Sequence, residues 1–105
     1  MSYKTNPQND LSRIIQIALL GEVPPTLRFI YAKIENDSLY FHAVFTENAT
    51  DDHLNSASIV ATEVVSHFDS SIHLQENIER NDSIPWRIGS GENLFFLRYG
   101  ELNDI

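Results

Sequence analysis

Cysteine is absent from this 105-residue sequence, and so are long apolar runs. Without cysteine the chain can form neither a disulfide framework nor a zinc site built on thiolates. No apolar run approaches the roughly 20 residues that a membrane-spanning helix needs. The first ten residues, MSYKTNPQND, are polar and lack the pattern of a secretory signal peptide. We therefore expect a cytoplasmic protein with no membrane partner.

Basic residues are scarce. Lysine and arginine together number 7 against 15 aspartates and glutamates, which gives a formal net charge of −8. The span from Ile34 to Glu79 contains nine acids and no lysine or arginine. A phosphate backbone repels such a surface, so we expect no nucleic-acid partner. The acids either keep the protein soluble or attract a basic protein partner and speed its encounter.

Motifs for catalysis and metal binding are also missing. The Gly-Ser-Gly sequence at 89–91 lacks the lysine and the following helix of a phosphate-binding loop. The four histidines form no His-x-x-x-His pair. We predict that the protein is not an enzyme and has no cofactor or metal site. The alternative is a small enzyme that uses His42, Tyr31 and Tyr40 on one face of a sheet for acid–base chemistry.

The stretch TLRFIYAKIENDSLYFHAVFT, residues 26–46, predicts a β-hairpin, because two runs of aromatic and β-branched residues flank a turn. Asn36 and Asp37 suit a two-residue turn with positive φ, and a longer turn is the alternative. The two-residue turn places one set of mostly apolar residues on a core face: Arg28, Ile30, Ala32, Ile34, Leu39, Phe41, Ala43 and Phe45. We expect the other face to be partly solvated and partly covered by a helix; it carries Leu27, Phe29, Tyr31, Lys33, Tyr40, His42, Val44 and Thr46.

Two helices are predicted from apolar spacing. The first covers 11–20, is capped by Asn9 or Asp10, and is apolar over much of its surface. The second covers 51–67, is capped by Thr50, and should pack its apolar side on the core face of the hairpin. Each helix is preceded by residue types that accept hydrogen bonds from free amides at a helix start.

Two further strands are predicted near the end of the chain. Residues 72–79 alternate but are polar, which favours a strand at the edge of the sheet. Residues 94–99 are apolar on both faces, which favours a central or covered strand. Between them, Trp86 and Arg87 have the composition of a binding hot spot, and the alternative is a tryptophan that closes one end of the core.

These elements, in the order α-β-β-α-β-β, predict an α+β fold in which two helices pack on a single antiparallel sheet of four strands. A chain of 105 residues with 42% hydrophobic residues is long enough for one domain with one core. We expect one domain over residues 1–105, with residues 1–8 and 102–105 flexible and the last residues, 100–105, forming a polar tail.

The segments LLGEVPPTLRFIYAKIENDSLYFHAVF, ATEVVSHF and FFLRYGE lie between Leu19 and Glu101. They resemble small immunity proteins of bacterial contact-dependent growth inhibition and related polymorphic toxin systems. The resemblance implies a cytoplasmic protein that binds one cognate nuclease toxin domain and blocks it. Such families vary most at their binding surfaces, so no toxin-contacting residue carries over by motif.

The acids at the hairpin turn, at the second helix start and around the third strand are the candidate partner surface for a basic protein. Their positions are Glu35, Asp37, Glu47, Asp51, Asp52, Asp69, Glu76 and Glu79. For Asp51 and Asp52 the alternative role is to stabilise the helix dipole. A third class of function, a structural module that associates with itself through the third or fourth strand, leaves the oligomeric state open.

Overall fold

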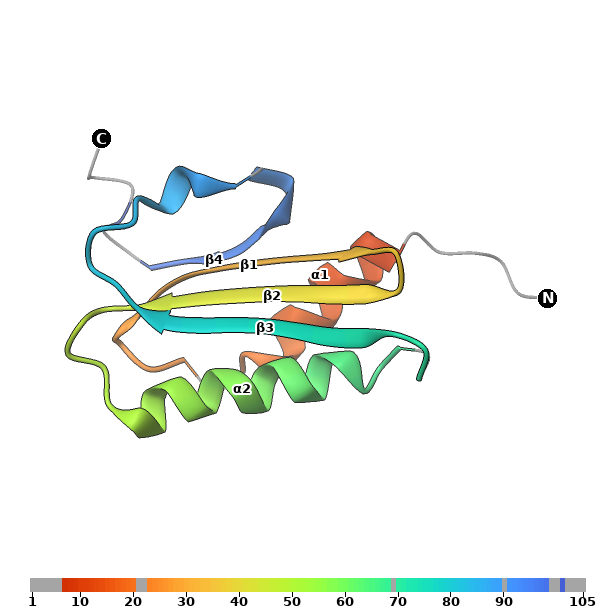
Figure 1. The fold of residues 1–105 in the computed structure, drawn as a ribbon, viewed down its shortest axis with the longest axis horizontal. Helices are drawn as coiled ribbons and strands as arrows, with labels where there is room; N and C mark the ends of the chain where they lie inside the picture. The colour runs from red at the N-terminus through yellow and green to blue at the C-terminus, as the bar shows by residue number, and fades with distance from the viewer. Residues whose placement is uncertain (1–6, 21–22, 69, 90, 99–100, 102–105) are drawn as a thin grey trace.

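The computed structural model describes residues 7–20, 23–68, 70–89, 91–98 and 101. Two helices and four strands follow one another in the predicted order, so the α+β class is confirmed (Figure 1). Their bounds are α1 Pro7–Ala18, β1 Leu27–Glu35, β2 Ser38–Phe45, α2 Asp51–Val65, β3 His73–Arg80 and β4 Leu94–Leu97, with short 3-10 turns at Trp86–Ile88 and Gly91–Asn93. In the part of the chain that the structure describes, no helix has the length and apolarity that crossing a membrane requires.

The sheet has the strand order β3-β2-β1-β4 and is mixed. Strand β1 pairs antiparallel with β2 and with β4, whereas β2 and β3 run parallel. The purely antiparallel sheet predicted from the sequence was therefore wrong in this one pairing. The reason is the connection, because α2 carries the chain back along the sheet before β3 begins, and a strand–helix–strand unit produces parallel neighbours.

The hairpin turn has the predicted two-residue form. Asn36 and Asp37 have φ values of 52° and 63°, and Ile34 pairs with Leu39 as expected. Positive φ at both central residues matches the right-handed twist of the flanking strands. The predicted register holds from this turn to the pair Phe29 and Val44.

The predicted pairing of Arg28 with Phe45 is wrong, because β1 contains a bulge between Leu27 and Phe29. Leu27 is the residue opposite Phe45, and Phe29 is opposite Val44. One extra residue in a strand reverses the facing of the side chains beyond it. Leu27 therefore joins the core below the sheet, and the Arg28 side chain lies on the opposite face.

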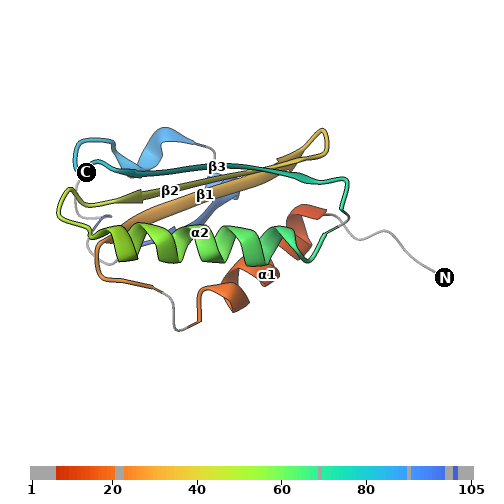
Figure 2. The same ribbon diagram turned by 60° about the horizontal axis from the view of Figure 1, so that its bottom comes forward.

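Both helices pack on the same face of the sheet, here called the helix face (Figure 2). The predicted stripe of α1 is buried: Leu11, Ile14, Ile15 and Ala18. Leu19 is buried beside this stripe, whereas Ile17 is 54% exposed and Leu20, just beyond the helix, is 77% exposed. The helix also begins earlier than predicted, at Pro7, so Asn9 and Asp10 lie inside its first turns rather than at the cap.

Helix α2 begins as predicted and ends two residues early, at Val65. The hydroxyl of Thr50 accepts a hydrogen bond from the His53 amide at 3.1 Å, and the Thr50 amide donates to Nδ1 of His53 at 3.4 Å. This reciprocal arrangement satisfies two amides that have no partner within the helix. Ala57, Val60, Ala61 and Val64 are buried against the helix face, while Phe68, beyond the end of the helix, is only partly buried.

The opposite face of the sheet is covered by an irregular segment rather than by a helix (Figure 2). Residues 81–89 and 91–93, here called the cover segment, run from β3 to β4 across this face. A second, smaller apolar cluster lies beneath it: Phe29, Tyr31 and Val44, with Ile84, Trp86, Leu94 and Leu97 packed around them. Strand β4 is therefore covered on both faces as predicted, although it lies at the edge of the sheet.

Candidate functional site

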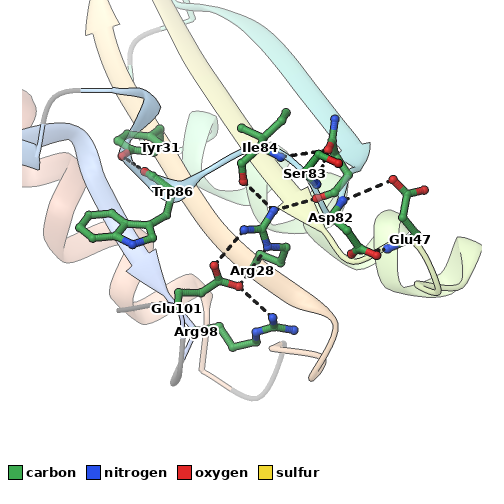
Figure 3. A network of polar contacts seen from close by, with 10 residues as sticks. Arg28, Tyr31, Glu47, Asp82, Ser83, Ile84, Trp86, Arg98 and Glu101 are labelled. Atoms are coloured by element: carbon green, nitrogen blue, oxygen red, sulfur yellow. Dashed lines mark hydrogen bonds and ion pairs between the residues drawn. The ribbon is translucent and has the colours of Figure 1, made fainter. Parts of the chain in front are cut away.

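The cover segment is held in place by Arg28, which is only 6% exposed. Its Nη1 donates hydrogen bonds to the carbonyl oxygens of Asn81 and Ile84, each at 2.8 Å (Figure 3). Its Nε and Nη2 donate to the two carboxylate oxygens of Glu101 at 3.0 and 2.8 Å. A planar guanidinium satisfies these acceptors together because its donors have a fixed fork geometry. The bulge in β1 thus brings together two segments from the last quarter of the chain.

Glu101 was predicted to lie in a polar tail, and this was wrong. The residue is 2% exposed, and its carboxylate also accepts a hydrogen bond from Nη2 of Arg98 at 2.8 Å. Hydrogen bonding to the Arg28 guanidinium holds the pKa of the Glu101 carboxyl below its ordinary value, and this outweighs the opposite effect of burial. The side chain of Glu101 is therefore a buried anion at neutral pH.

Trp86 closes the smaller apolar cluster. Its carbonyl accepts a hydrogen bond from the Tyr31 hydroxyl, and its ring packs against the cluster (Figure 3). The Arg87 guanidinium lies 4.8 Å from the centre of the Trp86 ring. This geometry favours the interpretation of Trp86 as a residue that closes the core over the interpretation as a binding hot spot.

A groove of about 630 Å³ lies between the cover segment and the polar part of the same sheet face. Its walls include Tyr31, Tyr40 and His42, the residues of the alternative enzyme hypothesis, so the sheet does bring these three residues to one place. Strand β3 contributes Gln75 and Asn77. The groove is open and lined by aromatic and amide groups.

The ionisable groups around this groove already have partners within the chain. Nε2 of His42 lies 2.7 Å from Oε2 of Glu79. Nζ of Lys33 lies 3.3 Å from Oε1 of Glu35 and 5.7 Å from the centre of the Tyr40 ring. Among the residues that the structure describes, no three histidine, aspartate or glutamate side chains are grouped to hold a metal ion.

Several of the predicted acids lie along β3. Glu76 and Glu79 are on the strand itself and on opposite faces of it, because Glu76 accepts hydrogen bonds from Oγ of Ser58 on α2 while Glu79 contacts His42. At one end of β3 the carbonyl of Asp37 accepts a hydrogen bond from the His73 amide. At the other end of β3, Nη2 of Arg80 donates a hydrogen bond to Oδ1 of Asp51 at 2.7 Å.

Glu47 continues this row beyond the end of β3. The Glu47 amide donates to Oδ1 of Asp82 at 2.9 Å, and the Asp82 amide donates to Oε2 of Glu47 at 3.3 Å. Asp82 was not among the predicted acids, although it lies only two residues after the end of the strand. Glu35 lies on β1 and pairs with Lys33, and Asp52 is exposed in the first turn of α2. Asp69 lies outside the described residues.

Sequence reasoning missed the buried pair of Arg28 and Glu101. The alternation of the strand placed the charged Arg28 on the apolar core face, and this charge among apolar residues was the one signal of a bulge. Arg28 is the exception on an otherwise apolar face, and a charged residue is almost never fully buried unless it is paired. Glu101 offered no comparable signal.

Comparison with known proteins supports the resemblance. A search of curated proteins finds no matching relative. The family model described as MafI2 immunity protein matches residues 8–100. This span includes both helices apart from the first residue of α1, all four strands and the cover segment. The chain therefore belongs to the MafI2 immunity protein family.

Proposed function

We propose that this protein binds and neutralises a cognate nuclease toxin domain in the cytoplasm, without catalysis of its own. Membership of an immunity protein family implies a toxin as the protein partner. The observation that supports a basic partner is the row of acids along β3, from Asp37 past Glu76 and Glu79 to Asp51 and Glu47. The chain as a whole carries a net charge of −8.

The mechanism follows from the charge of a nuclease substrate. A nuclease needs a basic surface to hold a phosphate backbone, and that surface attracts an acidic protein. An inhibitor that occupies the basic surface, or a site beside it, excludes the substrate. Charge complementarity of this type raises the association rate and selects against other partners.

The first test takes as the candidate toxin the protein encoded immediately upstream of the gene for this chain. Purified in active form, it should degrade nucleic acid, and one equivalent of the immunity protein should abolish the degradation. A degradation rate that is unchanged at tenfold excess of the immunity protein over toxin would overturn the proposed function. A partner without nuclease activity would overturn the nuclease part of it.

A matched pair of variants tests the role of the acids. Glu76→Lys and Glu63→Lys each change the net charge equally, and both residues are exposed, but Glu63 lies on α2 and Glu76 on β3. We expect Glu76→Lys to lower the association rate about tenfold at low salt and to reduce its salt dependence, as removal of electrostatic steering does. Glu63→Lys should have a much smaller effect. Equal effects of the two variants would show that only net charge matters.

A further inference from the structure

The outer side of β3 is the longest open edge of the sheet. The eight residues of β3 pair with β2 over the whole strand, and no other described strand lies beyond it (Figure 1). All eight are half-buried or exposed. Strand β4, at the other edge, has only four residues and none of them is acidic. The open edge and the row of acids therefore coincide on β3.

The direction of the backbone groups of β3 follows from its two end contacts. The His73 amide donates to the Asp37 carbonyl at 2.8 Å, and the Asn81 amide donates to the Phe45 carbonyl at 2.7 Å. In a parallel ladder, alternate residues bond to a given neighbour, so the odd-numbered residues of β3 bond to β2. The amide and carbonyl groups of the even-numbered residues point away from the sheet. These residues are Leu74, Glu76, Ile78 and Arg80.

We propose that this edge binds an extended basic segment of the toxin as a fifth strand; this rests on the proposed function. Backbone hydrogen bonds then supply affinity, and side chains supply specificity. A strand added to a sheet lies about 5 Å from its neighbour. Its side chains alternate between the two faces, so they reach Glu76 on the helix face and Glu79 on the cover face.

The charge of β3 selects a basic occupant. Arg80 is the single lysine or arginine in the strand, and it is engaged by the carbonyl of Ala49 and by Asp51. Basic side chains of an added strand therefore face the carboxylates of Glu76 and Glu79. Oppositely charged pairs across neighbouring strands are stabilising.

A second copy of this chain fits the edge poorly. Pairing of β3 with itself brings Glu76 and Glu79 of each copy toward the same acids of the other copy. Like charges in opposed positions destabilise a strand pair, and two chains of net charge −8 repel each other at longer range as well. The charges thus discourage pairing between identical chains and leave the edge open to a basic strand.

The first experiment measures amide hydrogen exchange of the immunity protein, alone and bound to a catalytically inactive form of the toxin domain encoded upstream. In the free protein, the amides of Asn77 and Glu79 should exchange slowly, because they bond to β2, while those of Glu76 and Ile78 should exchange rapidly. Binding should slow the Glu76 and Ile78 amides at least about tenfold, because they become bonded. If the complex forms but the exchange rates of the Glu76 and Ile78 amides do not change, the strand-addition proposal is overturned, while the proposed function stays intact.

The second experiment compares Glu76→Pro with Glu76→Gln. Both remove the same charge, but only proline removes the outward amide, and proline is tolerated where the lost N–H faces solvent at an edge strand. We expect Glu76→Pro to bind the inactive toxin at least about tenfold more weakly than Glu76→Gln, the size of one lost hydrogen bond of about 1.4 kcal/mol. Equal affinities of two folded variants would overturn the proposal.

The free protein provides a further control. Light scattering should show a monomer. A dimer in which the Glu76 and Ile78 amides are already protected would show that the edge is occupied by a second copy, which overturns the choice of occupant. Failure of the wild-type protein to bind the toxin would instead count against the proposed function, so the two ideas fail in different ways.

Discussion

On the helix face of the sheet, the cluster around Phe41 and Phe45 is apolar, whereas the opposite face buries Arg28 and Glu101 beneath the cover segment. The helix face is stabilised by removal of apolar surface from water, which has no direction. The cover face combines a smaller apolar cluster with hydrogen bonds of fixed geometry from Arg28 and Tyr31. The same sheet therefore has one face stabilised mainly by apolar packing and one that depends in addition on directional hydrogen bonds.

This difference also separates the two faces in their response to conditions. Apolar burial does not change with pH, whereas an ion pair is lost once its carboxylate is protonated. A buried charge that loses its partner is costly, because it is left without solvation. Acid should therefore weaken the attachment of the cover segment before it weakens the packing of the helices.

The largest effect is expected for Phe41→Ala. Phe41 is 1% exposed at the centre of the helix face, and truncation of a buried phenylalanine costs about 3–5 kcal/mol. Urea titration at pH 7 and at pH 5 should give the same loss of unfolding free energy. A loss that depends on pH over this range would contradict the separation of the two faces.

Glu101→Gln should cost about 3 kcal/mol at neutral pH, because it leaves the buried Arg28 charge without its anion. The hydrogen bond with Arg28 lowers the pKa of Glu101 in the folded protein. The wild-type protein therefore has the full stabilisation from this ion pair above the pKa of about 4.3 that the carboxyl has in the unfolded chain. It loses this stabilisation as the pH falls through the lower pKa of the folded state. The gap in unfolding free energy between the two proteins should narrow in acid. A gap that stays constant down to pH 2 would show that the carboxylate charge is not what stabilises the cover face.

A pair of glycines in the cover segment gives a local test. A methyl group added at Gly89 would lie 2.9 Å from Cε1 of Tyr31, whereas at Gly91 nothing lies within 4 Å. The Tyr31 ring is held by its hydrogen bond to Trp86, so the cover segment must move instead. Gly89→Ala should cost about 1 kcal/mol by overpacking, and Gly91→Ala under about 0.5 kcal/mol. Similar losses in thermal or urea unfolding would mean that the contact with Tyr31 is easily relieved.

Thr50→Ala should cost about 1 kcal/mol, the usual value for a lost N-terminal cap. The loss should be confined to the helix face, and hydrogen exchange of the His53 amide should accelerate because its acceptor is gone. The exchange rates of amides in the cover segment should not change. Acceleration in both places would show that the two faces open together.

The features that were predictable from the sequence are local ones. The positive φ values of Asn36 and Asp37 follow from residue type, and the cap at Thr50 follows from three neighbouring positions. The apolar spacing of α2 located its buried side correctly. Each of these predictions depends on residues that are close to one another in sequence.

The features that were not predictable depend on distant contacts. The bulge at Arg28 is stabilised by Glu101, which is 73 residues away, and no local pattern encodes such a pair. The parallel pairing of β2 with β3 follows from the path of α2 over the sheet. For the candidate surface, the polarity of residues 72–79 correctly predicted a strand at the edge of the sheet, whereas the contacts of Glu76 with Ser58 and of Glu79 with His42 depend on residues distant in sequence.

The distance in sequence between Arg28 and Glu101 has a consequence for the order of folding. Paired residues within the hairpin and between β2 and β3 are at most 35 residues apart, whereas β4 and Glu101 must return to β1 across a separation of more than 60 residues. Long loops are costly to close before their contacts repay the lost entropy. We expect the hairpin, α2 and β3 to be assembled in the rate-limiting transition state, with φ-values near zero at Glu101. The open edge of β3 would then exist before the cover face is complete, so a nascent chain would expose this edge before its fold has closed.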